Sequence, residues 1–222
     1  MNILKSVACG LFLLNIYNDA NAQRTISEGT FVYDIVIQPK DPKAKSPTGL
    51  SGAKTYVYLK GGLSRTEMIS SLGNETIIYN SKIGDAAILK EYSGQKLMIT
   101  LNKNNWAERN KKYVGVKFEN TSETKVIEGY NCKKAIAKLS DGSSISVYYT
   151  PELALMNKDF NYAFKNLAGF PVEYEYETNA MTFKYTLSQI NFNPVPASKF
   201  DFPKSGYRIM TYDENKEGKK ME

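Results

Sequence analysis

The chain contains no histidine, and this absence removes several kinds of chemistry at once. Imidazole is the usual general base near neutral pH and the commonest metal ligand in proteins, and it activates the nucleophile in Ser-His-Asp and Cys-His sites. None of these roles can be filled by histidine here. A phosphate-binding glycine loop is also missing. The sequence therefore predicts no catalytic residue, no cofactor site and no metal site, and we expect a protein that is not an enzyme.

A hydrophobic run long enough to span a membrane is lacking as well. The apolar stretch at residues 7–16 follows Lys5 and precedes Ala20-Asn21-Ala22, and it is shorter than the roughly 18 to 20 residues of a spanning helix. This pattern predicts a cleavable signal peptide at residues 1–22. Cys9 stands before the apolar core, where lipidation is not expected. We expect an exported protein that is periplasmic, at the cell surface or secreted.

Cysteine is scarce, with two in the chain. Cleavage after Ala22 leaves Cys132 alone, which excludes an intramolecular disulfide. Because Cys132 begins an expected strand, a small buried cysteine is favoured over a reactive thiol or an intermolecular bridge. The fold must be held by packing, and 16 tyrosines, 10 phenylalanines and 1 tryptophan supply the area for it.

Positive charge is present but not concentrated. The formal charge is +6, and adjacent lysines occur only as pairs, such as Lys111-Lys112 and Lys133-Lys134. A nucleic-acid site needs basic residues on one face, so no nucleic-acid partner is expected. A solvated basic surface is favoured, and weak attraction to anionic lipid or acidic partners is the alternative.

Short segments with alternating apolar side chains make up most of the chain. Strands are predicted at 30–38, 54–60, 64–70, 75–81, 86–92, 96–101, 126–129, 133–139 and 144–149. A proline-rich loop at 38–52 lies outside the sheet, and residues 102–112 are the convincing helical stretch. The pattern predicts a mainly β fold with a few covering helices.

The hairpin at residues 172–192 indicates strong curvature. Val172, Tyr174 and Tyr176 alternate with three glutamates, and one face is apolar while the other is charged. Glu173, Glu175 and Glu177 are therefore expected on a solvated face rather than as the paired carboxylates of a hydrolase. The apolar phase shifts at Ser188-Gln189, which requires a bulge. We expect one domain at residues 23–212, built on a strongly curved antiparallel meander, and a charged, disordered tail at residues 213–222.

Four stretches in the second half of the chain resemble a known family. They are EGYNCKK at 128–134, YYTPEL at 148–153, LAGFPVE at 167–173 and VPASKF at 195–200. They resemble the exported Bacteroidetes proteins of domain of unknown function 4412, which are similar to the GLPGLI family and more distantly to LolA/LolB lipoprotein carriers. The resemblance covers roughly residues 28 to 210 and implies an incomplete LolA-like barrel with helices over an apolar cavity. Gly169-Phe170-Pro171 departs from the GLPGLI run. The arginine that controls cargo release in the carriers resembles Arg65, a possible switch residue.

Three functions remain open from the sequence. The first is a hydrophobic-ligand carrier for a lipid or an acylated protein, with a cavity lined by Phe31, Tyr33, Ile35, Tyr56, Tyr58, Ile78, Tyr174, Phe183 and Tyr185. These side chains could instead form a solid core. The second is a ligand-free module that meets an envelope protein through loops at 38–52 and 150–164, which a filled interior would favour. A carboxylate-based hydrolase is the remote third. A monomer is the default.

Overall fold

One large sheet and one small sheet organise the part of the chain that the computed structural model describes, residues 23–41, 43, 48–178 and 180–218. The predicted signal peptide lies outside these residues. The strands are β1 (Arg24–Ile26), β2 (Glu28–Pro39), β3 (Lys54–Lys60), β4 (Leu63–Ser70), β5 (Gly73–Asn80), β6 (Asp85–Tyr92), β7 (Gln95–Leu101), β8 (Glu119–Ile127), β9 (Tyr130–Lys138), β10 (Ser144–Thr150), β11 (Leu153–Leu155), β12 (Phe170–Glu177), β13 (Met181–Asn191) and β14 (Arg208–Thr211).

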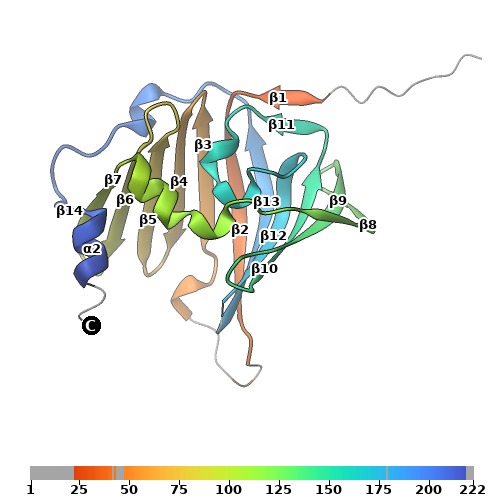
Figure 1. Cartoon of the computed structure of the whole chain (residues 1–222), viewed down its shortest axis with the longest axis horizontal. Coiled ribbons are helices and arrows are strands. Elements are labelled where there is room, and N and C mark those ends of the chain that lie inside the picture. The colour runs from red at the N-terminus through yellow and green to blue at the C-terminus, as the bar shows by residue number, and fades with distance from the viewer. Residues whose placement is uncertain (1–22, 42, 44–47, 179, 219–222) are drawn as a thin grey trace, which may run out of the picture.

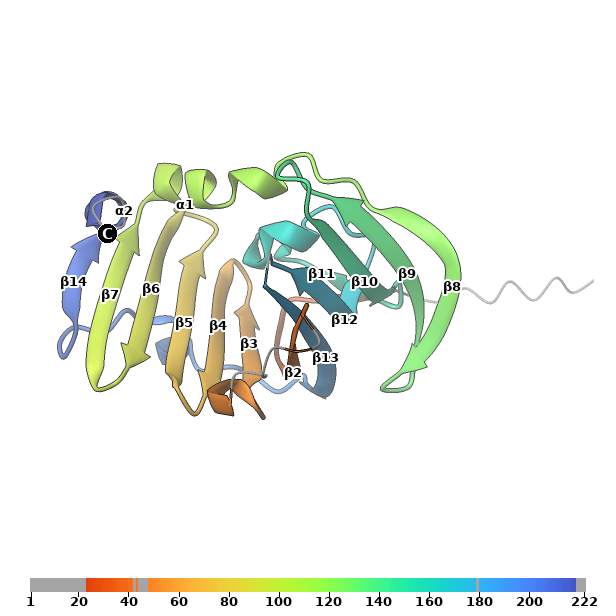
Figure 2. The same ribbon diagram turned by 90° about the horizontal axis from the view of Figure 1, so that it is seen from below.

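The large sheet is open and curved, and the predicted meander is interrupted where β2 pairs with β13 and where β14 pairs with β7. Its order is β14-β7-β6-β5-β4-β3-β2-β13-β12-β10-β9-β8, and its strands are antiparallel except where β14 runs parallel to β7. The edge strands β14 and β8 stand at opposite ends of the curve (Figures 1 and 2). The predicted mainly β fold, with a strongly curved antiparallel sheet that stops short of a closed barrel, is confirmed.

The expected bulge in β13 lies where the apolar phase shifts. The register of β13 against β2 slips between Leu187 and Gln189, so Ile190 meets Phe31 on the face where Leu187 meets Tyr33. The extra residue keeps both apolar pairs on one side of a strongly bent strand.

Helical segments cover one face of the sheet. The helix α1 (Lys103–Arg109) is capped by the Asn102 side chain, which accepts from the backbone N–H groups of Asn104 and Asn105. The 3₁₀ turns η2 (Lys111–Tyr113), η3 (Lys158–Phe160) and η4 (Tyr162–Phe164) continue this cover, as Figure 2 shows. We call the face beneath them the concave face.

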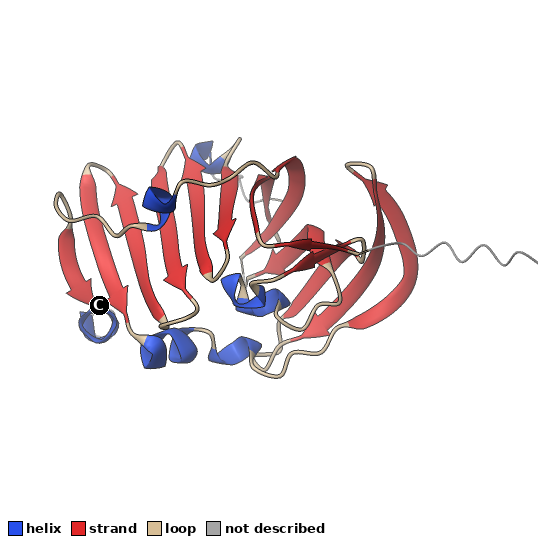
Figure 3. Cartoon of the chain, turned by 90° about the horizontal axis from the view of Figure 1, so that it is seen from above, coloured by secondary structure: helices blue, strands red, loops and turns tan. Residues whose placement is uncertain are grey.

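The opposite face of β3–β7 is covered by a segment that the sequence did not predict to be structural. Residues 195–207, here called the strap, include η5 (Ala197–Phe200) and cross these strands (Figure 3). Val195 and Phe200 of the strap pack against Ile78, Leu89 and Met98. The strap leads into β14 and then into α2 (Tyr212–Gly218). The prediction of a disordered tail from residue 213 is therefore wrong as far as Gly218, because Glu214 caps this helix by accepting from the Thr211 backbone and hydroxyl.

Candidate functional site

The strand register separates the nine residues predicted to line one cavity. Phe31, Tyr33, Ile35, Tyr174, Phe183 and Tyr185 lie on the concave face, and Tyr56, Tyr58 and Ile78 lie on the face under the strap. The register pairs Tyr56 with Val32 and Tyr58 with Thr30, so both tyrosines point away from Phe31 and Tyr33. The prediction that all nine residues line one cavity is therefore wrong. In β3 it is Val57 and Leu59 that face the concave core.

Part of the concave face is a filled core. The ring of Phe31 lies 4.8 Å from that of Phe170, and the ring of Phe164 in η4 lies 4.8 Å from that of Tyr174. Tyr33 is 2% exposed, and its hydroxyl donates to the carbonyl oxygen of Pro171 at 2.8 Å. Close ring packing and a satisfied hydroxyl are the marks of a core. These residues therefore act in folding.

Further apolar side chains on the concave face are only partly buried. Six half-buried side chains share this face, and together they are called the concave apolar surface: Ile37, Met68, Ile77, Tyr176, Phe183 and Tyr185. Phe183 is paired with Ile37 on one side and Tyr176 on the other, and the rings of Tyr176 and Tyr185 lie 6.1 Å apart. Partly exposed apolar side chains that share one face of a sheet are typical of an interaction site.

One ion pair borders the concave apolar surface. Glu75 faces Met68 across the β4–β5 register, and its carboxylate lies 3.9 Å from the Lys90 ammonium. Burial, with a smaller contribution from the Glu75 charge, raises the pKa of Tyr185 to about 12. Tyr185 therefore stays a neutral donor at physiological pH. The surface can meet a ligand with an apolar body and a polar end.

Arg65 lies under the strap, away from the concave face. Its Nε donates to Glu67 and its Nη1 donates to the carbonyl oxygen of Lys199 at 3.1 Å. The Lys199 ammonium in turn lies 4.5 Å from the centre of the Tyr58 ring. Arg65 and Glu67 are 19% and 13% exposed. Arg65 therefore fastens the strap to β4. The residue predicted as a switch thus has a structural role in this fold.

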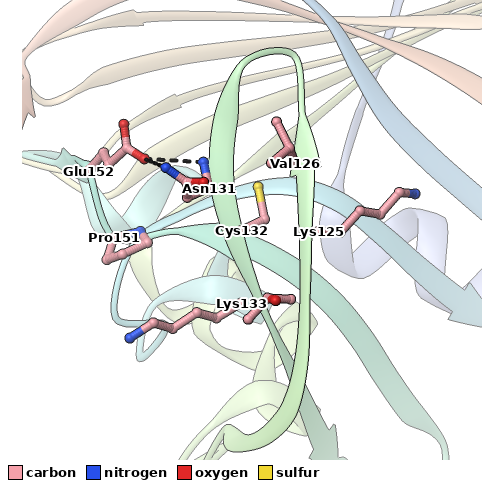
Figure 4. A pocket seen from close by; sticks show the side chains of 8 residues that line it. Lys125, Val126, Asn131, Cys132, Lys133, Pro151 and Glu152 are labelled. Carbon is pink, nitrogen blue, oxygen red and sulfur yellow. Dashed lines mark hydrogen bonds between the residues drawn. The ribbon is translucent and has the colours of Figure 1, made fainter.

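A pocket of about 570 Å³ opens beside Cys132, between the β8–β9 hairpin and the turn after β10 (Figure 4). Two of the family-like stretches meet here, because the backbone N–H and side-chain amide of Asn131 donate to Glu152 at 3.1 and 3.4 Å. Figure 4 shows the Cys132 sulfur between the two strands of the hairpin. The residue is 1% exposed, and burial raises the pKa of its thiol to about 11. The prediction of a small buried cysteine is confirmed.

Sequence reasoning missed the environment of Glu173. This side chain was expected on a solvated face, but it is buried, and its carboxylate lies 3.3 Å from Lys125 and 3.2 Å from Lys184. Lys184 also reaches Glu175 at 3.7 Å. The charge is thus neutralised across β8, β12 and β13, as a buried charge requires. Cross-strand partners of this kind could have been found only with the strand order in hand.

The described residues hold no group of three or more Cys, Asp or Glu side chains that could bind a metal ion. No helix in the same part of the chain has the length and apolarity needed to cross a membrane.

Comparisons with known proteins were made by family, by curated sequence and by structure. A family model described as "Domain of unknown function (DUF4412)" matches residues 43–207. No curated protein matches the chain. Among solved structures, PNGF-II in the P21 space group is 14% identical with a TM-score of 0.48, over 86% of this chain and 33% of that one. The chain thus spans about a third of PNGF-II.

Two further structures are similar over most of their own length. An uncharacterized conserved protein from Thermus thermophilus is 9% identical with a TM-score of 0.44, over 83% of this chain and 91% of that one. A beta-barrel-like protein of domain of unknown function DUF1849 from Brucella abortus is 10% identical with a TM-score of 0.35, over 75% of this chain and 98% of that one.

Proposed function

This chain belongs to the DUF4412 family, and from that premise we propose that it is an exported envelope protein that binds an amphipathic ligand on its open concave face. The ligand is a lipid or an acylated peptide, and binding proceeds without catalysis. The single observation that carries the proposal is the concave apolar surface, where Phe183, Tyr176 and Met68 stay partly exposed on the concave face of a curved sheet.

The chemistry of this surface suits an amphiphile. Each CH₂ group that an acyl chain buries against Phe183 and Met68 contributes about 0.8 kcal/mol, so a segment of several carbons is enough for useful affinity. The hydroxyl of Tyr185 and the Glu75–Lys90 ion pair lie beside the apolar side chains and supply partners for a polar end. Small-molecule sites combine an apolar lining with a few polar groups in this way.

The filled core beside this surface limits how the ligand is held. Phe164 and Tyr174 occupy the depth of the half-barrel, so an acyl chain lies along the concave face and is not enclosed. A ligand bound in this manner exchanges readily, which fits delivery between partners better than storage.

The same filled core favours a second candidate. If the concave apolar surface is a contact for another envelope protein and takes no lipid, the protein is a ligand-free interaction module. In that case the surface binds no small apolar probe, and a partner protein covers it.

Two neighbouring residues of β4 test the proposal. Met68 is half-buried on the concave face, and Ile69 is exposed on the opposite one. We expect Met68→Gln to weaken displacement of a fluorescent fatty-acid probe at least fivefold, because a polar amide replaces apolar contact area, and Ile69→Gln to leave it within a factor of two. Equal effects of both variants, or no probe binding by the wild-type protein, would contradict the proposal and favour the interaction module.

A further inference from the structure

A second pocket lies at the end of β4 and β5 opposite to Met68. Its volume is about 600 Å³. The β3–β4 turn lines it with Gly61 and Gly62, the β5–β6 turn lines it with Ser81 and Lys82, and residues 156–159 with 165–166 close the other side. We call it the rim pocket. It shares no residue with the concave apolar surface, so it is a separate site.

The rim pocket has an excess of positive charge. Lys82, Lys158 and Lys165 line it together with one acidic residue, Asp159. The Lys165 ammonium lies 2.6 Å from the Asp159 carboxylate. Among the residues that the structure describes, neither Lys82 nor Lys158 forms an ion pair, and both are exposed. Two cations without counter-charges in one concavity attract an anion.

The side chain of Lys82, one of these two lysines, packs against the wall of the pocket. The stem of Lys82 lies against Gly62, where an added Cβ would come within 2.9 Å of Lys82 Cγ and 3.4 Å of its Cε. The hydroxyl of Ser81 and the N–H of the same residue both donate to the carbonyl oxygen of Gly62. The two turns are therefore tied together, and the aliphatic part of Lys82 packs on their junction. Less side-chain freedom is then lost when this lysine meets a ligand.

A buried donor without a partner also lines the rim pocket. Asn157 is 7% exposed, and its Nδ2 atom has no hydrogen-bond partner in the described part of the chain. Buried polar groups in native proteins are nearly always satisfied. An oxygen acceptor that enters the pocket supplies the missing partner once the amide turns toward it.

We propose that the rim pocket binds a phosphate group, with Lys82 and Lys158 supplying the charge and Asn157 an amide donor. A phosphate offers several acceptor oxygens to donors that converge from different elements, and lysine is an established binder of phosphate as a compact point charge. The donors come from the β5–β6 turn and from the segment around η3, which line the pocket together. The phosphate belongs either to a soluble phosphate ester or to a phospholipid headgroup.

The site is tested by calorimetric titration with inorganic phosphate. The protein used is the full chain after the processing that it undergoes in the cell. We expect binding by the wild-type protein and at least a tenfold loss of affinity in the double variant Lys82→Ala/Lys158→Ala. The control is Lys138→Ala/Lys204→Ala, which removes the same charge from exposed positions outside the pocket and is expected to stay within a factor of two. Unchanged urea midpoints in both variants establish that the fold is kept.

A vesicle experiment distinguishes the two sources of phosphate. Sedimentation with phosphatidylglycerol–phosphatidylcholine vesicles, and with phosphatidylcholine alone as the neutral reference, reports headgroup binding. Phosphate binding without enrichment on anionic vesicles assigns a soluble ester. Phosphate binding together with enrichment that depends on Lys82 and Lys158 assigns a headgroup. If the wild-type protein binds no phosphate, or if both double variants lose affinity equally, the rim pocket is not a phosphate site. Either result leaves the concave apolar surface untouched.

Discussion

Burial decides the chemistry of individual side chains in this protein. Cys132 is enclosed by the β8–β9 hairpin, and the cost of burying a thiolate raises its pKa to about 11. Tyr33 is also buried, and its hydroxyl donates to the carbonyl oxygen of Pro171. Glu173 is buried beside two lysines, Lys125 and Lys184. For Cys132 and Tyr33, burial favours the protonated form at physiological pH.

The thiol of Cys132 should therefore react slowly. A pKa that rises from 9.0 to about 11 lowers the thiolate fraction at pH 8 about 100-fold. We expect reaction with a disulfide reagent at pH 8 to be at least this much slower in the native protein than in urea-unfolded protein, since burial also blocks access. Comparable rates in the two states would show that the hairpin does not enclose the sulfur.

At the scale of elements, the strap explains why both faces of β3–β7 are apolar. It is tied to the sheet at several points: the N–H of Val195 donates to Glu28 at 2.6 Å, Arg65 donates to the carbonyl of Lys199, and the hydroxyl of Tyr207 donates to Glu91. Contacts at both ends and in the middle hold a segment without β-strands flat on the sheet. The strap therefore acts as an additional layer of the fold.

Removing the central contact should loosen this layer. Arg65→Ala leaves the Glu67 carboxylate, 13% exposed, without its cationic partner, and we expect a loss of about 1 to 3 kcal/mol in the free energy of unfolding. Arg65→Lys should recover part of this, and Arg208→Ala, at an exposed position, should have little effect. Urea unfolding measures the change. Normal stability of Arg65→Ala combined with altered ligand release would instead identify Arg65 as a switch.

The elements that the sequence predicted are those with one apolar face. The strand at residues 54–60 begins and ends as expected, and the bulge after Leu187 lies at the predicted place. The polar strand β8 has almost no apolar signal before Ile127, and β1, β11 and β14 are too short to show a period. Their pairing depends on the rest of the fold.

The candidate site was harder to predict from the sequence than the strands were, and the reason is physical. Alternation shows that Tyr56 and Val57 point in opposite directions, but it does not show which direction is inward. The size of the side chains predicts that Tyr56 faces the cavity, but the strap buries the outer face, and in β3 it is Val57 that points inward. The rim pocket joins two turns to the η3 segment, and no sequence pattern brings these together.

At the scale of the whole molecule, stability should depend on pH in the alkaline range. Burial raises the pKa values of Tyr33 and Tyr174, that of Tyr185 to about 12 and that of Cys132 to about 11. The unfolded chain releases these protons from about pH 9 to 10 upward, while the folded chain retains them. The stabilisation is therefore complete below pH 9 and is lost as pH rises toward 12.

Urea unfolding at pH 8, 10 and 11 checks this dependence. We expect midpoints that fall steadily with pH, with tyrosinate absorbance at 295 nm appearing together with unfolding. A midpoint that stays constant up to pH 11, or tyrosinate signal from all tyrosines before unfolding, would show that the aromatic core is open to solvent.

We propose that the concave face, the predicted signal peptide and the +6 charge belong to a protein that works among envelope lipids, and one measurement tests this proposal most directly. The chain is expressed with residues 1–22 in the envelope of a bacterial host, purified, and examined by native mass spectrometry before and after organic extraction. We predict a processed chain that begins at Gln23 and carries a lipid or acylated peptide whose mass is lost on extraction, with less of it on Met68→Gln. A clean mass of the unliganded chain, unchanged by extraction, would contradict the account.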